Sequence, residues 1–180
     1  MNVNIGCGPH YAAGWVNVDR IHNPDLNIVP DIVNPTGRPL LLDIGNDVER
    51  IYLGHVLEHV PWDHVAGFLG ECLALLKPGG QCLVVGPDVF RTLRMWKNGQ
   101  VPDTLMHAVL EGADPQVDDI EARWDGARHQ WNADQQRVAF QMRRAGFENV
   151  TEFPQVRDVP DGWPIVSRVE WQSAVIGVAP

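Results

Sequence analysis

A strand–helix–strand pattern in the middle of the chain is the feature that most constrains its fold. Residues 50–53 form a short apolar run, and an apolar stripe with helical spacing follows Pro61. The stripe consists of Val65, Phe68, Leu69, Cys72, Leu73 and Leu76. Lys77-Pro78-Gly79-Gly80 is a strong helix stop, and the continuous apolar run at residues 81–85 is typical of a strand buried on both faces. Because parallel strands are joined by right-handed crossovers, this order predicts an α/β protein with a parallel sheet.

Other segments of the chain have patterns that extend this sheet. Strands are predicted at residues 3–5, 16–18, 27–33, 150–153 and 170–178. A second helix is predicted at residues 132–145, where Asn132 or Asp134 can cap the start and Gly146 can end the last turn. Residues 89–131 are helical in parts and rich in Trp and acidic side chains, so we expect a helical cap-like insertion there.

The composition of the chain limits its partners and its cell compartment. A chain of 180 residues fits a single domain, residues 1–180, and its formal net charge is −9. The 14 Lys and Arg residues are scattered, so neither duplex nucleic acid nor a membrane is an expected partner. The three cysteines are too few for a disulfide framework and predict free thiols. With no signal sequence and no window as long as a membrane span, the protein is expected to be cytoplasmic.

A glycine-rich turn after the first predicted strand is the first clue to function. In Asn4-Ile5-Gly6-Cys7-Gly8, the glycines let the backbone bend and approach a ligand without an intervening Cβ. A dinucleotide fingerprint would place a third glycine at position 11, where this chain has Tyr11, so NAD is not expected. We expect Gly6→Val to abolish ligand binding while leaving much of the fold intact.

Two acidic residues stand at the ends of the next predicted strands. Asp19 follows residues 16–18, at the position where Rossmann-type sites hold the ribose hydroxyls. Asp31, near the end of residues 27–33, could receive the amino group of an adenine. The alternative is that both carboxylates only solvate the strand ends. The glycine turn that precedes Asp19 favours the nucleoside interpretation.

Several motifs follow one another in an order that is known from one family. They are Ile5-Gly6-Cys7-Gly8, Gly14-Trp15-Val16-Asn17-Val18-Asp19, Leu53-Gly54-His55-Val56-Leu57-Glu58-His59-Val60-Pro61, Glu71-Cys72-Leu73-Ala74-Leu75-Leu76-Lys77-Pro78-Gly79-Gly80, Pro87-Asp88 and Ala145-Gly146-Phe147. Together they resemble the short class I methyltransferases of the type 11 group, up to about Asp88 and again from His129 to Val150. The resemblance implies an α/β Rossmann-like sheet, mostly parallel with an antiparallel C-terminal strand, and S-adenosyl-L-methionine as cofactor. Residues 8–19 and 19–31 are too short for full crossover helices, so reduced first crossovers are expected.

The resemblance also implies a cofactor site. The glycine turn would pass under the methionine and ribose portions of the cofactor, and Asp19 would hold the ribose. Arg20 and Ile21, which follow Asp19, would lie near the adenine, and Asp31 and Ile32 would border it. Gly54 and His55, which follow the predicted strand at residues 50–53, would border the methionine. The implied members are Gly6, Cys7, Gly8, Asp19, Arg20, Ile21, Asp31, Ile32, Gly54 and His55.

The segment from His55 to His59 also matches H-x-x-E-H, a zinc-peptidase motif. On a helix, His55 and His59 would share one face, as two zinc ligands must. Pro61 follows almost at once and disfavours a helix here, and no later segment repeats helical ligand spacing for a third ligand. We therefore expect no metal. For His59 the alternative of a hydrogen-bonded core histidine stays open.

Methyl transfer to a hydroxyl acceptor requires alignment of the reactants and a base. His55, which leaves the strand bearing the implied cofactor site, is the first candidate base, and His129 and Asp88 are further candidates. Each has an ordinary alternative, because His55 could only support the cofactor, Asp88 could cap a helix and His129 could lie in a surface loop. Three tryptophans could form the acceptor pocket, namely Trp96, Trp124 and Trp131, although tryptophans at irregular spacing more often belong to the core.

The leading hypothesis from the sequence is an S-adenosylmethionine-dependent methyltransferase that methylates oxygen on a small hydroxylated acceptor, such as a sugar or another metabolite. The alternative is a catalytically silent Rossmann-like binding module that keeps the fold, with or without the cofactor. Neither the methylated atom nor the oligomeric state follows from the sequence.

Overall fold

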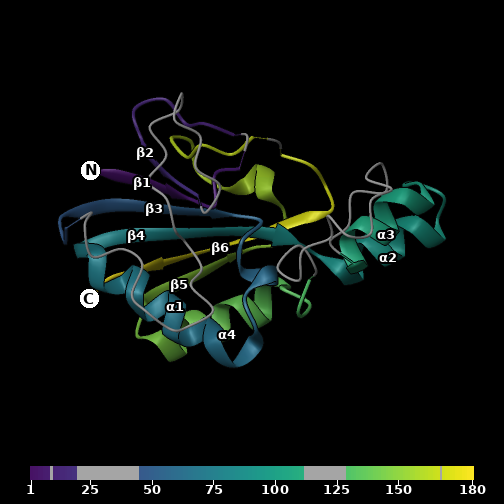
Figure 1. The fold of residues 1–180 in the computed structure, drawn as a ribbon. Coiled ribbons are helices and arrows are strands. Elements are labelled where there is room, and N and C mark those ends of the chain that lie inside the picture. The colour runs from purple at the N-terminus through teal and green to yellow at the C-terminus, as the bar shows by residue number, and fades with distance from the viewer. Residues whose placement is uncertain (9, 20–44, 112–128, 167) are drawn as a thin grey trace, which may run out of the picture.

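Six strands of the described chain form one sheet in the order β2-β1-β3-β4-β6-β5 (Figure 1). The computed structural model describes residues 1–8, 10–19, 45–111, 129–166 and 168–180. The strands are β1 (Asn2–Ile5), β2 (Val16–Val18), β3 (Val48–Gly54), β4 (Leu76–Pro87), β5 (Glu148–Phe153) and β6 (Gln172–Val178). β1 to β4 pair in parallel, and β6 lies antiparallel between β4 and β5. The predicted mostly parallel sheet with an antiparallel C-terminal strand is confirmed.

β1 lies inside the sheet because the chain places β2 on one side of it and β3 on the other. Ile5 at the end of β1 pairs with Val18 of β2 and with Leu53 of β3. The order of strands therefore reverses between β1 and β3, which is the switch point where α/β sheets bind ligands beside their carboxyl ends. The strand expected at residues 27–33 lies outside the described residues.

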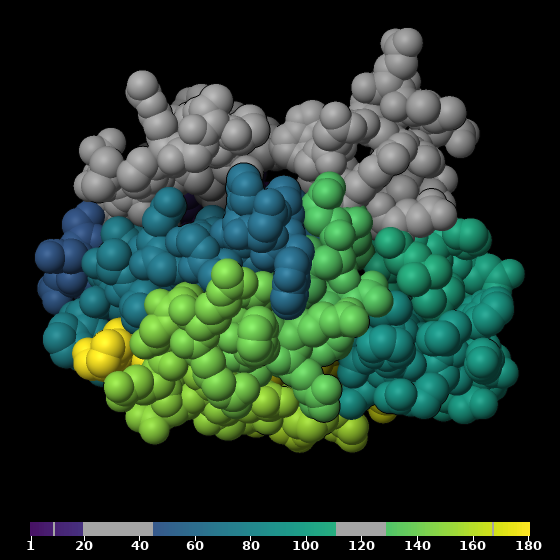
Figure 2. Space-filling view, turned by 90° about the horizontal axis from the view of Figure 1, so that it is seen from below, coloured from purple at the N-terminus to yellow at the C-terminus, as the bar shows by residue number. Residues whose placement is uncertain are grey.

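Helices cover one face and one end of this sheet. α1 (Trp62–Leu75) and α4 (Gln135–Ala145) pack against each other on one face (Figure 1). α2 (Val89–Lys97) and α3 (Asp103–Glu111) form a contacting pair beyond the carboxyl end of β4, within the segment expected to form a cap. Figure 2 shows the α1–α4 face, with the α2–α3 pair beside it at one end of the molecule.

α1 ends at Leu75, just before the predicted helix stop at residues 77–80, and β4 begins at once at Leu76. The sequence predicted the strand only from Gln81 onward. Leu76 pairs with Val48, and the pairing resumes at Gln81 after a register shift. Gly79 has a φ of +75°, in the left-handed region that favours glycine. Residues 77–80, which predict a helix stop, therefore form an irregular part of β4, and the strand is longer at its start than predicted.

The ends of α4 follow the sequence prediction closely. The side chain of Asp134 accepts hydrogen bonds from the amides of Gln136 and Arg137, both at 3.1 Å, so Asp134 and not Asn132 is the N-cap. Gly146 ends the helix in the left-handed conformation with a φ of +102°.

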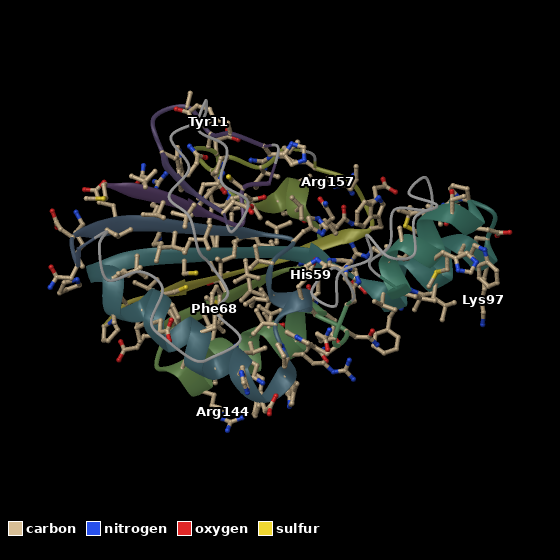
Figure 3. The ribbon with its side chains drawn as sticks, viewed as in Figure 1. Tyr11, His59, Phe68, Lys97, Arg144 and Arg157 are labelled. Atoms are coloured by element: carbon tan, nitrogen blue, oxygen red, sulfur yellow. The ribbon has the colours of Figure 1, made fainter. Side chains whose placement is uncertain are left out.

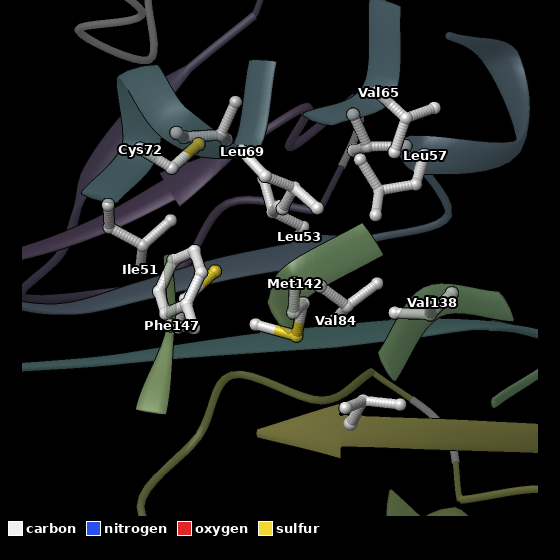
Figure 4. Close-up of a cluster of buried hydrophobic side chains, with 14 of the residues drawn as sticks. Ile51, Leu53, Leu57, Val65, Leu69, Cys72, Val84, Val138, Met142 and Phe147 are labelled. Carbon is white, nitrogen blue, oxygen red and sulfur yellow. The ribbon is translucent and has the colours of Figure 1, made fainter. Parts of the chain in front are cut away.

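Strand side chains alternate between two apolar layers. Figure 4 shows the larger layer, where Leu53 and Val84 of the sheet meet Leu69 of α1 and Met142 of α4, all of them buried. The opposite face carries a smaller cluster that includes the 3₁₀ turn η5 (Val156–Asp158). Its buried members are Tyr52, Leu83, Val85, Val156, Val159, Trp163, Ala174 and Ile176.

The three cysteines are free and buried, as the sequence predicts. Burial raises the pKa of the Cys72 and Cys82 thiols well above its ordinary value, so both stay protonated. Within the described residues, no helix has the length and apolar character needed to cross a membrane.

Candidate functional site

A cavity of about 370 Å³ lies at the carboxyl ends of β1, β3 and β4. Gly6 and Cys7 of the glycine turn line it together with Gly54 and His55 at the end of β3. Trp171, which directly precedes β6, contributes to another part of the lining. The volume falls within the roughly 300–1,000 Å³ of small-molecule sites. The structure therefore brings two of the predicted site segments together at the β1–β3 switch point.

The carboxylate of Asp19 lies against the glycine turn. The amide of Gly8 donates a hydrogen bond to Asp19 Oδ2 at 2.6 Å, and Asp19 is only 8% exposed. The amides of Gly6 and Cys7 donate to the carbonyl of Val18 at 2.8 and 3.3 Å, which ties the turn to the end of β2. Burial and the charge of Asp19 raise the pKa of the Cys7 thiol to about 11, so this thiol stays protonated. The glycine turn and Asp19, at the end of β2, therefore lie against each other, as the sequence predicts.

The glycines of the site are needed for different reasons. Gly6 has a φ of +69°, and a Cβ added there would collide with the side chain of Val56. A Cβ on Gly54 would lie 2.5 Å from the Tyr52 hydroxyl. At Gly8, which has a φ of +49°, no atom of the described residues lies within 4 Å of an added Cβ. Gly6→Val would therefore disrupt packing as well as binding, which corrects the expectation that much of the fold would stay intact.

His55 is held in an unusual conformation by its neighbours. Its φ of +58° costs a residue other than glycine roughly 1–3 kcal/mol. Its amide donates to the carbonyl of Val85 at 2.8 Å, and its ring Nδ1 lies 3.0 Å from Glu58 Oε1. Ring Nε2 lies 2.6 Å from Nε2 of Gln172, whose buried Oε1 has no hydrogen-bond partner among the described residues. With its hydrogen on Nδ1 toward the Glu58 carboxylate, the ring of His55 accepts at Nε2 from the Gln172 amide.

The contact between His55 and Glu58 shifts the pKa of both side chains. Burial lowers the pKa of His55, but the hydrogen bond to Glu58 and the charge of that carboxylate outweigh burial, so the pKa is raised. Burial raises the pKa of Glu58, and the hydrogen bond and charge of His55 outweigh it in turn, so the pKa of Glu58 is lowered. Nδ1 is held by Glu58 and Nε2 lies against Gln172, so neither ring nitrogen is free to take a proton from a ligand. The geometry favours a supporting role for His55 over a role as base.

The other two candidate catalytic residues are not among those that line the cavity. Asp88 is the N-cap of α2, since its Oδ1 accepts a hydrogen bond from the amide of Arg91 at 2.9 Å. His129 Nδ1 lies 2.7 Å from the carbonyl of Val109, and its ring centre lies 5.0 Å from that of His59. Four of the implied cofactor residues lie outside the described residues, namely Arg20, Ile21, Asp31 and Ile32.

The cavity also contains residues that the sequence analysis did not assign, namely His10, Tyr52, Trp171 and Gln172. A signal for two of them was present in the topology. Because β6 is antiparallel to β4, its first residue lies beside the carboxyl end of β4, where Gln172 pairs with Pro87. The residues at and just before the start of an antiparallel C-terminal strand therefore lie beside the carboxyl ends of the parallel strands, where the cavity is.

The tryptophans expected to form the acceptor pocket lie elsewhere. Trp96 Nε1 donates to Asp103 at 2.6 Å, and Trp131 Nε1 donates to the carbonyls of Leu57 and Val60, both at 2.9 Å. Neither tryptophan is among the residues lining the cavity, and Trp124 lies outside the described residues. Among the described residues, the tryptophan that lines the cavity is Trp171.

Comparison with known proteins identifies the fold family of this sheet. No family model and no curated protein matches the sequence. Solved structures do match. A SAM-dependent methyltransferase from Thermotoga maritima, a possible histamine N-methyltransferase, superposes with a TM-score of 0.59 and 14% identity over 100% of this chain and 82% of that one. A SAM-dependent methyltransferase from Archaeoglobus fulgidus superposes with a TM-score of 0.55 and 13% identity over 98% and 85% of the two chains. The chain has the class I methyltransferase fold.

The likeness of this methyltransferase fold to solved structures extends to longer proteins. The S-adenosylmethionine-dependent methyltransferase SibL matches with a TM-score of 0.54 and 13% identity over 99% of this chain, which spans only 50% of SibL. At such low identities the likeness establishes the fold, and the ligands must be inferred from the chain's own residues.

Proposed function

We propose that the protein is an S-adenosylmethionine-dependent methyltransferase that acts on a small hydroxylated acceptor. The observation that carries this proposal is the contact between the glycine turn and Asp19 beside a cavity at the switch point of the sheet. A bend without side chains allows a nucleoside to approach the backbone, and a carboxylate at the end of the neighbouring strand can accept hydrogen bonds from both ribose hydroxyls.

The described residues fit the cofactor. No atom of the described residues occupies the space that a Cβ on Gly8 would enter, and Gly6 and Cys7 line the cavity. The bound cofactor would supply an electrophilic methyl group. The turn would support its methionine and ribose portions, and Asp19 would hold the ribose. His55, which lines the same cavity, would border the methionine portion.

The rest of the cavity suits a small acceptor with a hydroxyl group. Val85 and Trp171 provide apolar surface. Burial and the charge of Glu58 raise the pKa of Tyr52 to about 12, so the Tyr52 hydroxyl stays protonated and can donate to the acceptor. Because both ring nitrogens of His55 are bound, we assign the other cavity imidazole, His10, to accept the proton of the acceptor hydroxyl.

Calorimetric titration with S-adenosylhomocysteine tests the cofactor site. We expect one binding site per chain. Asp19→Asn should weaken binding about tenfold, or about 1.4 kcal/mol, because asparagine can still accept from the Gly8 amide but carries no charge for the ribose hydroxyls. Asp63→Asn, at the exposed start of α1, is the matched control and should leave the affinity unchanged. Absence of binding at millimolar ligand would refute the proposal.

Turnover separates an enzyme from a silent binding module. With labelled S-adenosylmethionine and a panel of small hydroxylated acceptors, we expect transfer of the label by the unaltered protein. His10→Ala should lower turnover about 100-fold or more with unchanged affinity for S-adenosylhomocysteine, because the exposed His10 is a base and not a cofactor contact. Binding without transfer to any acceptor would favour the silent module.

A further inference from the structure

We propose that Glu58, His59 and His129 bind a divalent transition-metal ion of the first row. Each side chain offers one ligand atom, a carboxylate oxygen or a ring nitrogen, and the three atoms lie within 4.8 Å of one another. Glu58 and His59 belong to the 3₁₀ turn η2 (Leu57–His59) that follows β3, whereas His129 comes from the segment before α4. Figure 3 shows His59 at the end of the sheet that faces the α2–α3 pair.

Glu58 has an unsatisfied oxygen in the protein interior. The residue is 0% exposed, and its Oε1 accepts the hydrogen bond from His55. Its Oε2 is buried and has no hydrogen-bond partner among the described residues. A buried carboxylate oxygen without a partner is unfavourable, and buried charges are normally paired or bound to a metal. A cation beside Glu58 would satisfy this atom.

His129 is oriented as metal-bound histidines usually are. Its Nδ1 lies 2.7 Å from the carbonyl of Val109, so Nδ1 carries the hydrogen and Nε2 carries the lone pair. Histidine ligands of metals typically donate their other ring N–H to a carboxylate or a backbone carbonyl, which fixes the tautomer and the plane of the ring. The Val109 carbonyl plays this part here.

Hydrogen bonds hold the two halves of the site together. The amide of Gln130 donates to the carbonyl of Glu58 at 2.7 Å. The indole of Trp131 donates to the carbonyls of Leu57 and Val60, both at 2.9 Å. The segment that carries His129 is therefore fastened to η2 on both sides of Glu58, and the three ligand residues are brought together without a metal.

The donor set identifies the class of ion. Two imidazoles and one carboxylate suit Zn²⁺ and neighbouring transition metals, whereas Mg²⁺ and Ca²⁺ prefer oxygen ligands alone. Adjacent ligand atoms of a tetrahedral zinc lie roughly 3.3 Å apart, and the three atoms here lie within 4.8 Å of one another, so small side-chain shifts are enough to bind the ion. Three protein ligands leave a coordination position for water or another oxygen ligand.

This site differs from the zinc-peptidase interpretation of the same motif. That interpretation uses His55 and His59 on one face of a helix, but the structure has a single 3₁₀ turn here. His55 Nδ1 is bound to Glu58, and its Nε2 lies against Gln172. In the proposed site Glu58 is a metal ligand that also binds the His55 ring. Because His55 lines the cavity and Glu58 does not, the ion would be separated from the cavity by His55. Metal binding by these three side chains would not require methyl transfer.

The test is titration of the metal alone into protein that carries no affinity tag and has been freed of metal with a chelator. We expect calorimetry with ZnCl₂, and elemental analysis after gel filtration, to give one Zn²⁺ per chain. Glu58→Gln and His129→Ala should each weaken Zn²⁺ binding by more than about 100-fold, because the loss of a direct ligand exceeds the effect of losing an outer partner. His64→Ala, on the exposed surface of α1, should bind as the unaltered protein does.

Circular dichroism of each variant shows whether it is folded. If the buried Glu58→Gln variant does not fold, His129→Ala decides the question, since His129 is only partly buried in a segment between helices. One equivalent of Zn²⁺ that is lost in His129→Ala and kept in His64→Ala supports the site. Absence of stoichiometric Zn²⁺ binding, or binding that is unchanged in His129→Ala, overturns it.

Discussion

Gly6, Gly8 and His55 have positive φ angles of +69°, +49° and +58°, and all three lie at the ligand end of the sheet. In two of them the absence of a Cβ makes this conformation inexpensive. In His55 the strain must be offset by the hydrogen bond to Glu58 and the contact with Gln172. Strain of this kind concentrates where a side chain is held in place for a ligand, which agrees with the site proposed here.

The two glycines of the turn should respond differently to the same substitution. At Gly8 an added methyl group meets no atom of the described residues, so Gly8→Ala should cost only the left-handed conformation, about 1–2 kcal/mol of unfolding free energy. At Gly6 the methyl group also collides with Val56, which should add about 1–3 kcal/mol. Urea unfolding of both variants measures the difference. Equal losses would show that Val56 moves aside without cost.

At the scale of elements, α2 depends on the residue that was also a candidate catalyst. Asp88 is 9% exposed, accepts from the Arg91 amide at 2.9 Å and forms an ion pair with the Arg91 side chain at 3.7 Å. Asp88→Ala should lower the unfolding free energy by about 1 kcal/mol, whereas Asp88→Asn should retain most of it because asparagine is as good an N-cap. Chemical denaturation checks both values.

The asparagine variant also separates the two roles of Asp88. If Asp88 only caps α2, Asp88→Asn should transfer methyl groups at nearly the rate of the unaltered protein. A loss of turnover in Asp88→Asn with normal stability would return Asp88 to the list of catalytic residues, since the amide preserves the cap but not the charge.

At the scale of the whole molecule, the cavity joins segments that are far apart in the sequence. The turn after β1, the end of β3 and the start of β6 all contribute to its lining. A ligand that bridges these segments must suppress their separate local openings. We predict that S-adenosylhomocysteine slows amide hydrogen exchange in residues 3–8, 51–57 and 171–174.

Hydrogen exchange measured by mass spectrometry at short times, where local opening dominates, checks this prediction. α4 lies on the opposite face of the sheet from the smaller apolar cluster and serves as the internal control, so its exchange should not change. Equal protection of α4 and of the cavity segments would contradict a ligand held at the switch point. It would indicate instead a general stabilisation of the fold.

The parts of the protein that follow from the sequence alone are those that depend on near neighbours along the chain. β1, β2, α1 and α4 were predicted because apolar periodicity, caps and glycine stops act over a few residues. The meeting of Asp19 with the glycine turn was also predictable, because adjacent parallel strands bring their carboxyl ends together. The α/β fold class follows from the same patterns.

The tertiary structure decided what depends on contacts between distant segments. It placed Trp171 and Gln172 in the cavity, engaged both ring nitrogens of His55 and set His129 beside Glu58. It also placed Val56 against Gly6, which changes the reason that a glycine is required there. No local pattern specifies such partners, because each depends on how whole elements pack and on where the segments between them return to the sheet.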